Sequence, residues 1–226
     1  VAIGGGGFGR SLGPLLIEKY IISLVKKKSP KICFIPTASG DNNLYKLNFY
    51  RAFSTLNCKT SHIDFFSRTE DLKRKVFDQD ILFVGGGNTK SMLAIWKEWN
   101  FDEILVNAYK NGIVMSGVSA GAICWFSKGI TDSFADKLEL IDCLGILDGV
   151  ACPHFDEEKE REPYVNKLIR QKLINSCICL EGNSALHIID EINFSSIDFG
   201  KGKNCLRVSD DSNILKREYF NKKIIL

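Results

Sequence analysis

A chain of 226 residues, 45% of them hydrophobic, is long enough to bury the core of one α/β domain, and we expect a single domain over residues 1–226. Its 30 basic and 27 acidic residues are interspersed and leave a formal net charge of +3, so the composition gives no sign of a nucleic-acid partner. There is no apolar span of membrane length and no secretory signal pattern, which predicts a cytoplasmic protein without a membrane partner.

Short β-rich runs alternate with longer amphipathic runs along the chain. Strands are expected at 1–6, 31–39, 59–66, 80–87, 112–117, 176–182 and 184–190, and helices at 13–28, 43–56, 88–99, 101–111, from about Ala120, and at 158–173. The last forty residues are expected to add short antiparallel strands at an edge. The pattern predicts an α/β fold, with a doubly wound, mostly parallel sheet flanked by helices and extended by C-terminal edge strands.

Eight cysteines lie mostly inside apolar runs and form no CxxC pair. This spacing is typical of buried free thiols in a reducing compartment, and it fits neither a disulfide framework nor a zinc site. We expect no metal and no cofactor.

Glycines follow the first strand in "VAIGGGGFG", where Gly4, Gly6 and Gly9 match GxGxxG. The match resembles a dinucleotide-binding turn, but the next helix starts late and no acidic residue ends a second strand about 20 residues further on. We therefore favour a structural glycine turn.

The stretch "GVSAG" places Ser119 between the β-branched run "GIVM" and the short helical run "AGAICWF". Small neighbours allow a sharp strand-to-helix turn that exposes the hydroxyl, which predicts a nucleophile. The Ala120 amide at the helix start is expected to donate to an oxyanion. The alternative is a small-residue turn needed only for packing.

A nucleophilic serine needs a base, and the chain contains three histidines. His62 and His187 lie in strand-like alternations and are expected to be structural. His154 follows a short apolar strand and Pro153, and it is the expected base.

The third member of a triad is a carboxylate that orients the imidazole. Glu181 ends the apolar run "CICLEG", where an unpartnered carboxylate would be costly, and it is the favoured acid. Asp132, after the nucleophile helix, is the alternative acid, and a turn or helix cap is its other interpretation.

The run "VGGGNT" ends another apolar strand. Its glycines predict a second oxyanion donor from Gly86 or Gly87, or else a plain turn. Asn88, at the start of the next helix, is expected to cap that helix and to bind substrate.

Together "VGGGNT", "GVSAGA", "TD", "CPHFD" and "LEGN" resemble, in order and spacing over about residues 30 to 190, peptidase family S51, the peptidase E (aspartyl dipeptidase) group, which is related to cyanophycinase. The resemblance implies a class I glutamine amidotransferase-like fold with a serine nucleophile. It assigns the triad to Ser119, His154 and Glu181, while Asp132 matches an aspartate also proposed as the triad acid.

The resemblance implies a serine exopeptidase, a dipeptidase acting on short peptides that can carry an N-terminal aspartate, with a homodimer as a candidate assembly. Arg161 falls near a family arginine suited to a substrate carboxylate, or else is a solvent-exposed helix charge. The alternatives are a cyanophycinase-like or amide hydrolase and a non-catalytic binding protein of the same fold.

Overall fold

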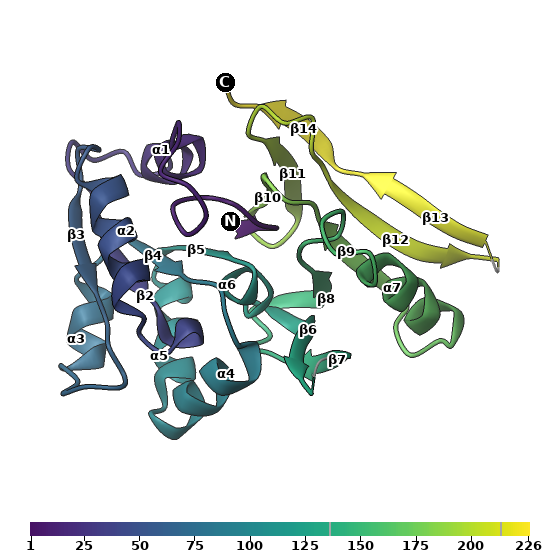
Figure 1. Cartoon of the computed structure of the whole chain (residues 1–226), viewed down its shortest axis with the longest axis horizontal. Coiled ribbons are helices and arrows are strands. Elements are labelled where there is room, and N and C mark those ends of the chain that lie inside the picture. The colour runs from purple at the N-terminus through teal and green to yellow at the C-terminus, as the bar shows by residue number, and fades with distance from the viewer. Residues whose placement is uncertain (136, 213) are drawn as a thin grey trace. The chain divides into compact units, whose positions relative to one another are not determined.

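The computed structural model describes residues 1–135, 137–212 and 214–226. The chain divides into two compact units. The N-terminal unit comprises residues 6–121, and the C-terminal unit comprises residues 1–5 together with residues 122–226. The colours of Figure 1 follow this division, because the N-terminal unit runs from purple to teal and most of the C-terminal unit from teal to yellow. A single domain over residues 1–226 stays a prediction.

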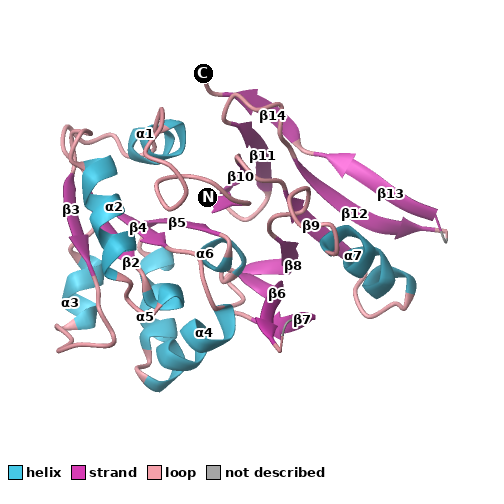
Figure 2. Cartoon of the chain, viewed as in Figure 1, coloured by secondary structure: helices cyan, strands magenta, loops and turns pink. Residues whose placement is uncertain are grey.

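The N-terminal unit is built around four parallel strands in the order β5-β4-β2-β3. Its elements in chain order are α1 (Leu16–Ser23), β2 (Lys31–Ile35), the 3₁₀ helix η1 (Thr37–Ser39), α2 (Asn43–Phe53), β3 (Lys59–His62), α3 (Leu72–Phe77), β4 (Ile81–Val84), α4 (Thr89–Glu98), α5 (Phe101–Lys110) and β5 (Val114–Val118). Figure 2 shows the helices flanking these strands, which confirms the predicted α/β alternation. Because the strands are parallel, their carboxyl ends meet at one edge.

Helix α1 is shorter than predicted. Leu15 has a left-handed backbone (φ 51°), so the helix begins only at Leu16, and it ends at Ser23. The helix predicted at 13–28 is therefore too long at both ends.

Aromatic side chains fill the core of the N-terminal unit. Phe34 on β2 stacks on Phe49 of α2 with ring centroids 5.0 Å apart, and Phe8 lies 5.1 Å from Phe83 of β4. Phe8 is 1% exposed. The loop that follows the glycine turn is thus anchored in the core by one large side chain.

Glu18 on α1 is a buried carboxylate that fastens the same loop. It is 1% exposed, and its Oε1 accepts the Phe8 backbone N–H at 2.6 Å. Burial disfavours the charged form and raises the pKa of Glu18 above its ordinary value of 4.5. The folded state therefore binds a proton more tightly here than the unfolded state does.

We expect Glu18→Gln to flatten the pH dependence of stability. The folded pKa is raised, so the contribution of Glu18 to stability is fully present below about pH 4.5 and is lost as the pH rises through the folded pKa. Glutamine keeps the acceptor for Phe8 but does not titrate, so its free energy of unfolding should gain on that of the parent from pH 4.5 to 8. Urea unfolding across this range measures the difference, with exposed Glu103→Gln as the control. A free energy of unfolding of Glu18→Gln that falls relative to that of the parent as the pH rises would contradict the assignment.

The C-terminal unit contains two sets of hydrogen-bonded strands, in the orders β14-β11-β10-β1 and β13-β12-β9-β8-β6-β7. Its elements are β1 (Ala2–Ile3), β6 (Phe126–Phe134), β7 (Lys137–Asp142), β8 (Leu147–Cys152), α7 (Arg161–Arg170), β9 (Ser176–Leu180), β10 (Ser184–Ile189), β11 (Asn193–Asp198), β12 (Cys205–Asp211), β13 (Ile214–Tyr219) and β14 (Asn221–Ile224). The short helix α6 (Ala120–Ile123) begins in the N-terminal unit and ends in this one.

The sequence did not predict that strands β13-β12-β9-β8-β6-β7 form a separate set. The expected edge strands divide between the sets, because β11 and β14 join one while β12 and β13 join the other, and β11 pairs with β14 in parallel rather than antiparallel. Helix α6 ends at Ile123 and β6 starts at Phe126, inside the run expected to be helical. Gly129 on β6 allows Ile123 of α6 to approach the strand closely, because a Cβ at position 129 would lie 2.7 Å from Ile123 Cδ1.

Helix α7 covers the six-stranded sheet. Its apolar face packs on the buried cluster of Ile130, Leu138, Val150, Cys152, Phe155, Val165, Leu168, Ile169, Ile174, Cys177, Cys179, Leu206 and Val208. All eight cysteines are free thiols, as predicted, and six of them are buried, while Cys58 and Cys143 are partly exposed. Burial raises the pKa of Cys152 and Cys179. Within the described ranges, no helix has the length and apolar character needed to cross a membrane.

Candidate active site

Ser119 is the one residue between the end of β5 at Val118 and the start of α6 at Ala120. Its φ of 57° lies in the left-handed region, which L-residues other than glycine, asparagine and aspartate rarely adopt. The chain therefore makes the sharp strand-to-helix turn that the GxSxG pattern predicts. Strained backbone of this kind concentrates at functional sites.

The glycines on either side of Ser119 are required by close backbone contacts. A Cβ on Gly117 would lie 2.2 Å from the Gly121 carbonyl oxygen, and a Cβ on Gly121 would lie 2.2 Å from the Val84 carbonyl oxygen. Real Cβ atoms do not approach a carbonyl this closely. Gly117 thus lets the turn close on itself, and Gly121 lets it pack against the end of β4.

We expect Gly121→Ala to lower the free energy of unfolding by about 3 kcal/mol or more, because backbone rather than a flexible side chain has to move. Gly112→Ala is the matched control, since Gly112 has a φ of 78° and open space around its Cα. That change should cost only the left-handed penalty of about 1–2 kcal/mol. Urea unfolding compares the two, and equal losses would contradict the steric argument.

The glycine turn after β4 lies against Ser119. A Cβ on Gly86 would lie 3.2 Å from Ser119 Cβ and 3.7 Å from its Oγ. The Gly86 amide donates to the Tyr45 hydroxyl at 3.4 Å, so this predicted oxyanion donor faces a phenol. Gly87 has a φ of 139°, and a Cβ there would lie 2.2 Å from the Ala38 carbonyl oxygen. The structure thus brings this turn to Ser119, and the oxyanion roles of Gly86, Gly87 and Ala120 stay predictions.

Asn88 caps α4, as predicted. Its side chain accepts the Ser91 backbone N–H at 2.8 Å, and its own backbone N–H donates to the Ala38 carbonyl at 2.7 Å. The cap fixes where the glycine turn ends. Substrate binding by Asn88 stays a prediction.

His154 follows β8 and is tied to a carboxylate three residues on. Its Nδ1 lies 2.6 Å from Glu157 Oε2, and its side chain is 10% exposed against 25% for Glu157. An ionised carboxylate only accepts hydrogen bonds, so Nδ1 carries the hydrogen and Nε2 is left able to accept a proton. This is the tautomer that a general base for a serine hydroxyl needs.

The backbone around His154 holds this pair in place. His154 has a φ of 52°, and its N–H donates to the Gly4 carbonyl at 3.1 Å. Its carbonyl accepts the Glu157 and Glu158 amides at 3.0 and 3.1 Å. The tight turn therefore brings the side chains at positions 154 and 157 to the same side.

Two glycines leave room for the His154–Glu157 pair. A Cβ on Gly5 would lie 2.8 Å from both His154 Nδ1 and Glu157 Oε2, and a Cβ on Gly182 would lie 2.2 Å from Glu157 Oε1. Gly4 likewise approaches the Glu181 carbonyl oxygen, at 2.2 Å from its added Cβ. These contacts give the glycines after β1 the structural role that we predicted over dinucleotide binding.

Sequence analysis missed Glu157. The signal was available in "PHFDEE", where a carboxylate stands three residues after the expected base, a spacing that one turn can close. The predicted acids lie at a strand end and in the loop after Ser119, whereas Glu157 lies in the same turn as the expected base.

The two predicted acids have other surroundings. Glu181 follows β9, and its Oε2 accepts the Asn204 backbone N–H at 2.8 Å. Asp132 is exposed on β6. Either one as the triad acid stays a prediction, and Glu157 is the carboxylate whose contact with His154 Nδ1 supports that role.

Arg161 is buried at the start of α7, with 2% of its surface exposed. Its Nε donates to Glu158 Oε2 at 2.6 Å and its Nη1 to the Ile130 carbonyl at 3.2 Å. The alternative of a solvent-exposed helix charge is therefore wrong. The contacts favour a structural role that joins α7 to β6, and substrate binding stays a prediction.

The other two histidines have structural surroundings. His62 Nδ1 lies 2.6 Å from the Tyr50 hydroxyl, and its Nε2 lies 3.4 Å from Asp64 Oδ2. Burial lowers the pKa of His187 on β10 to about 4, so its ring is neutral at physiological pH. In the part of the chain that the structure describes, no three His, Cys, Asp or Glu side chains are grouped so that they could hold a metal ion.

Comparison with known proteins identifies relatives over most of the chain. The sequence profile of peptidase family S51 matches residues 1–194. The chain is 44% identical over 209 residues to the uncharacterized peptidase YgaJ of Bacillus subtilis, an alignment that covers 92% of this chain and 90% of that protein. It is 25% identical over 155 residues to the uncharacterized peptidase Lmo0363 of Listeria monocytogenes, covering 63% of this chain and 71% of that one.

Solved structures share the fold at low sequence identity. A peptidase from an acI-B1 Actinobacterium superposes with a TM-score of 0.67 at 17% identity, covering 99% of this chain and 95% of that one. A Listeria monocytogenes EGD-e protein provisionally described as a peptidase E superposes with a TM-score of 0.59 at 15% identity, covering 96% of each chain. These likenesses support the predicted α/β fold with flanking helices.

Proposed function

We propose, from the premise that this chain belongs to peptidase family S51 and is a serine-type peptidase, that Ser119 is its nucleophile, His154 its general base and Glu157 the carboxylate that orients the base. The observation that carries the proposal is the left-handed backbone of Ser119 between a strand and a helix, inside the GxSxG pattern. Such a strand-to-helix turn presents the serine hydroxyl at the end of the strand.

The reaction follows from these assignments. Ser119 Oγ attacks the carbonyl carbon of the scissile peptide while His154 Nε2 takes its proton. The tetrahedral intermediate collapses when the same Nε2 gives the proton to the leaving amine, which leaves an ester on Ser119. Water then attacks the ester, His154 takes a proton from the water and returns it to Ser119 Oγ, and the acid is released.

Glu157 keeps its charge throughout. Its Oε2 accepts from Nδ1 of the imidazole, and it stabilises the imidazolium that forms in each half of the reaction. We assign the oxyanion to the amides of Gly87 and Ala120, because the turn of Gly87 lies against Ser119 and Ala120 opens a helix.

The substrate class that we propose is short peptides, cleaved by an exopeptidase of the dipeptidase type. Membership in family S51 supports hydrolysis of peptide bonds. A preference for an N-terminal aspartate rests on the resemblance of the sequence motifs to the peptidase E group.

Labelling with a fluorophosphonate tests the nucleophile. The folded parent should incorporate one probe per chain at Ser119, as read by peptide mass mapping, and should lose labelling after heating or after His154→Ala. A dipeptide library, scored by released amino acids, then ranks the N-terminal side chains. Labelling that survives His154→Ala at the parent rate would contradict the proposed base, and no hydrolysis of any dipeptide would contradict the exopeptidase assignment.

A further inference from the structure

Tyr45, in the first turn of α2, places a half-buried phenol beside the glycine turn that contacts Ser119. Its ring packs against Phe34 and Phe8, with centroids 4.9 and 5.3 Å away. Burial raises the pKa of Tyr45 to about 12, so the hydroxyl keeps its proton at physiological pH. The phenol is thus a neutral group held in a fixed orientation.

Glycines from two separate segments of the chain, Gly9 and Gly85, lie against the Tyr45 ring. A Cβ on Gly85 would lie 3.0 Å from Tyr45 Cε1, and a Cβ on Gly9 would lie 2.8 Å from Cε2 and 2.9 Å from the hydroxyl oxygen. Side chains at these positions would displace the phenol. The glycine loop after β1 and the turn after β4 therefore both leave the space that Tyr45 occupies.

The hydroxyl continues the contacts to the nucleophile. It accepts the Gly86 N–H at 3.4 Å, and the Cα of Gly86 faces Ser119, with an added Cβ only 3.2 Å from Ser119 Cβ. Three successive glycines have little intrinsic preference for one conformation. A hydrogen bond to the middle residue limits the rotation of its peptide group, and so limits the direction of the following Gly87 N–H.

We propose that Tyr45 is a positioning residue of the peptidase, whose phenol holds the Gly85–Gly87 turn in the conformation that Ser119 requires. The inference rests on the proposed function, because it assumes that Ser119 is the nucleophile. Tyr45 acts through Gly86 and not on the substrate itself. Loss of its hydroxyl should therefore slow the chemical step more than it weakens binding.

Tyr45→Phe removes the hydroxyl and keeps the ring. We expect kcat for the best dipeptide to fall about 10- to 100-fold, below the 10²- to 10³-fold typical for deletion of an oxyanion donor, with KM changed less than about 3-fold. The rate constant for fluorophosphonate labelling of Ser119 should fall in parallel. Rates are expressed per labelled active site, so any unfolded fraction drops out of the comparison.

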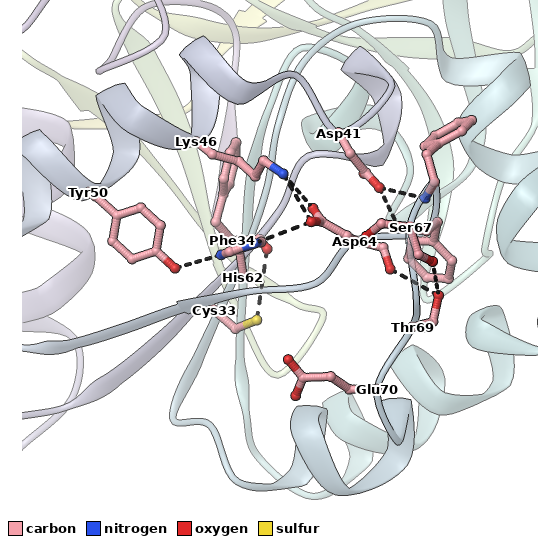
Figure 3. A network of polar contacts seen from close by, with 12 residues as sticks. Cys33, Phe34, Asp41, Lys46, Tyr50, His62, Asp64, Ser67, Thr69 and Glu70 are labelled. Atoms are coloured by element: carbon pink, nitrogen blue, oxygen red, sulfur yellow. Dashed lines mark hydrogen bonds and ion pairs between the residues drawn. The ribbon is translucent and has the colours of Figure 1, made fainter.

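Tyr50→Phe is the matched control on the same helix. Its hydroxyl lies 2.6 Å from His62 Nδ1 in the polar network of Figure 3. In that network Asp64 contacts both His62 and Lys46. This change removes one phenol hydrogen bond at a site that is not the glycine turn, and kcat should stay within about 3-fold of the parent. Equal losses of kcat in the two variants would overturn the positioning role.

The role of Tyr45 and the role of Ser119 can be tested separately. Parent-like turnover by Tyr45→Phe, in a protein that Ser119→Ala inactivates, overturns the role of Tyr45 and leaves the proposed function intact. Full activity of Ser119→Ala overturns both. A rise in KM with kcat unchanged would show that Tyr45 contributes to binding alone, and that result also overturns the positioning role.

Discussion

Glu157→Gln is expected to lower kcat by about 10³- to 10⁴-fold while leaving the fold intact. The glutamine amide can donate to His154 Nδ1, which forces the hydrogen onto Nε2 and removes the acceptor for the serine proton. The equivalent change in the best-studied Ser-His-Asp triad costs about 10⁴-fold for this reason. Steady-state kinetics on the best dipeptide, with circular dichroism to check folding, measures the effect.

Three matched variants separate Glu157 from its competitors. Asp156→Asn changes the neighbouring carboxylate but keeps an acceptor for the Gly182 amide, which lies 2.7 Å from Asp156 Oδ1. Glu181→Gln and Asp132→Asn change the acid that the sequence favoured and its alternative. Each should retain kcat within about tenfold of the parent, since the tautomer of His154 depends on its own partner. A larger loss from Glu181→Gln than from Glu157→Gln would move the triad acid to Glu181.

Ser119→Ala is expected to remove about 10³-fold or more of the peptidase rate and all fluorophosphonate labelling. Alanine keeps the Cβ that lies against Gly86, so the turn retains its packing and the melting temperature should change little. The comparison uses the same dipeptide and the same protein concentration as the parent. A residual rate within tenfold of the parent would remove Ser119 from the mechanism.

Ser116→Ala provides the matched control for Ser119. Ser116 lies three residues earlier, on β5, is fully buried, and donates from Oγ to the Leu82 carbonyl at 2.7 Å. Its loss should cost about 1 kcal/mol of stability and leave kcat within about 3-fold. The pair thus separates loss of a hydroxyl in this strand from loss of the nucleophile.

The strands of the N-terminal unit could be predicted because their sequences carry a strong signal. The runs "ICFI" and "ILFV" are buried at every position, which is typical of parallel strands covered on both faces. Strand β6 of the C-terminal unit carries a weaker one. In "FSKGITDSF" polar residues and Gly129 interrupt the apolar pattern, so neither alternation nor helical periodicity marks β6.

The candidate site shows the same division. Ser119 could be found from local sequence, because a nucleophile turn needs small residues at fixed positions, and Gly117 and Gly121 are those residues. The partner of His154 could not be ranked in this way. Glu157 and Glu181 are both acidic residues close to a strand end, and only the left-handed turn at His154 decides which carboxylate reaches Nδ1.

The proposed base and its acid also come from a single turn, at positions 154 to 157. Residues that come from one turn keep their spacing when loops elsewhere lengthen or shorten, whereas a triad assembled from distant strands depends on the register of the sheet. Insertions between residues 158 and 181 would leave the proton relay undisturbed. An engineer who moved this relay to another scaffold would carry four consecutive residues, and would need side-chain-free positions facing them where Gly5 and Gly182 stand here.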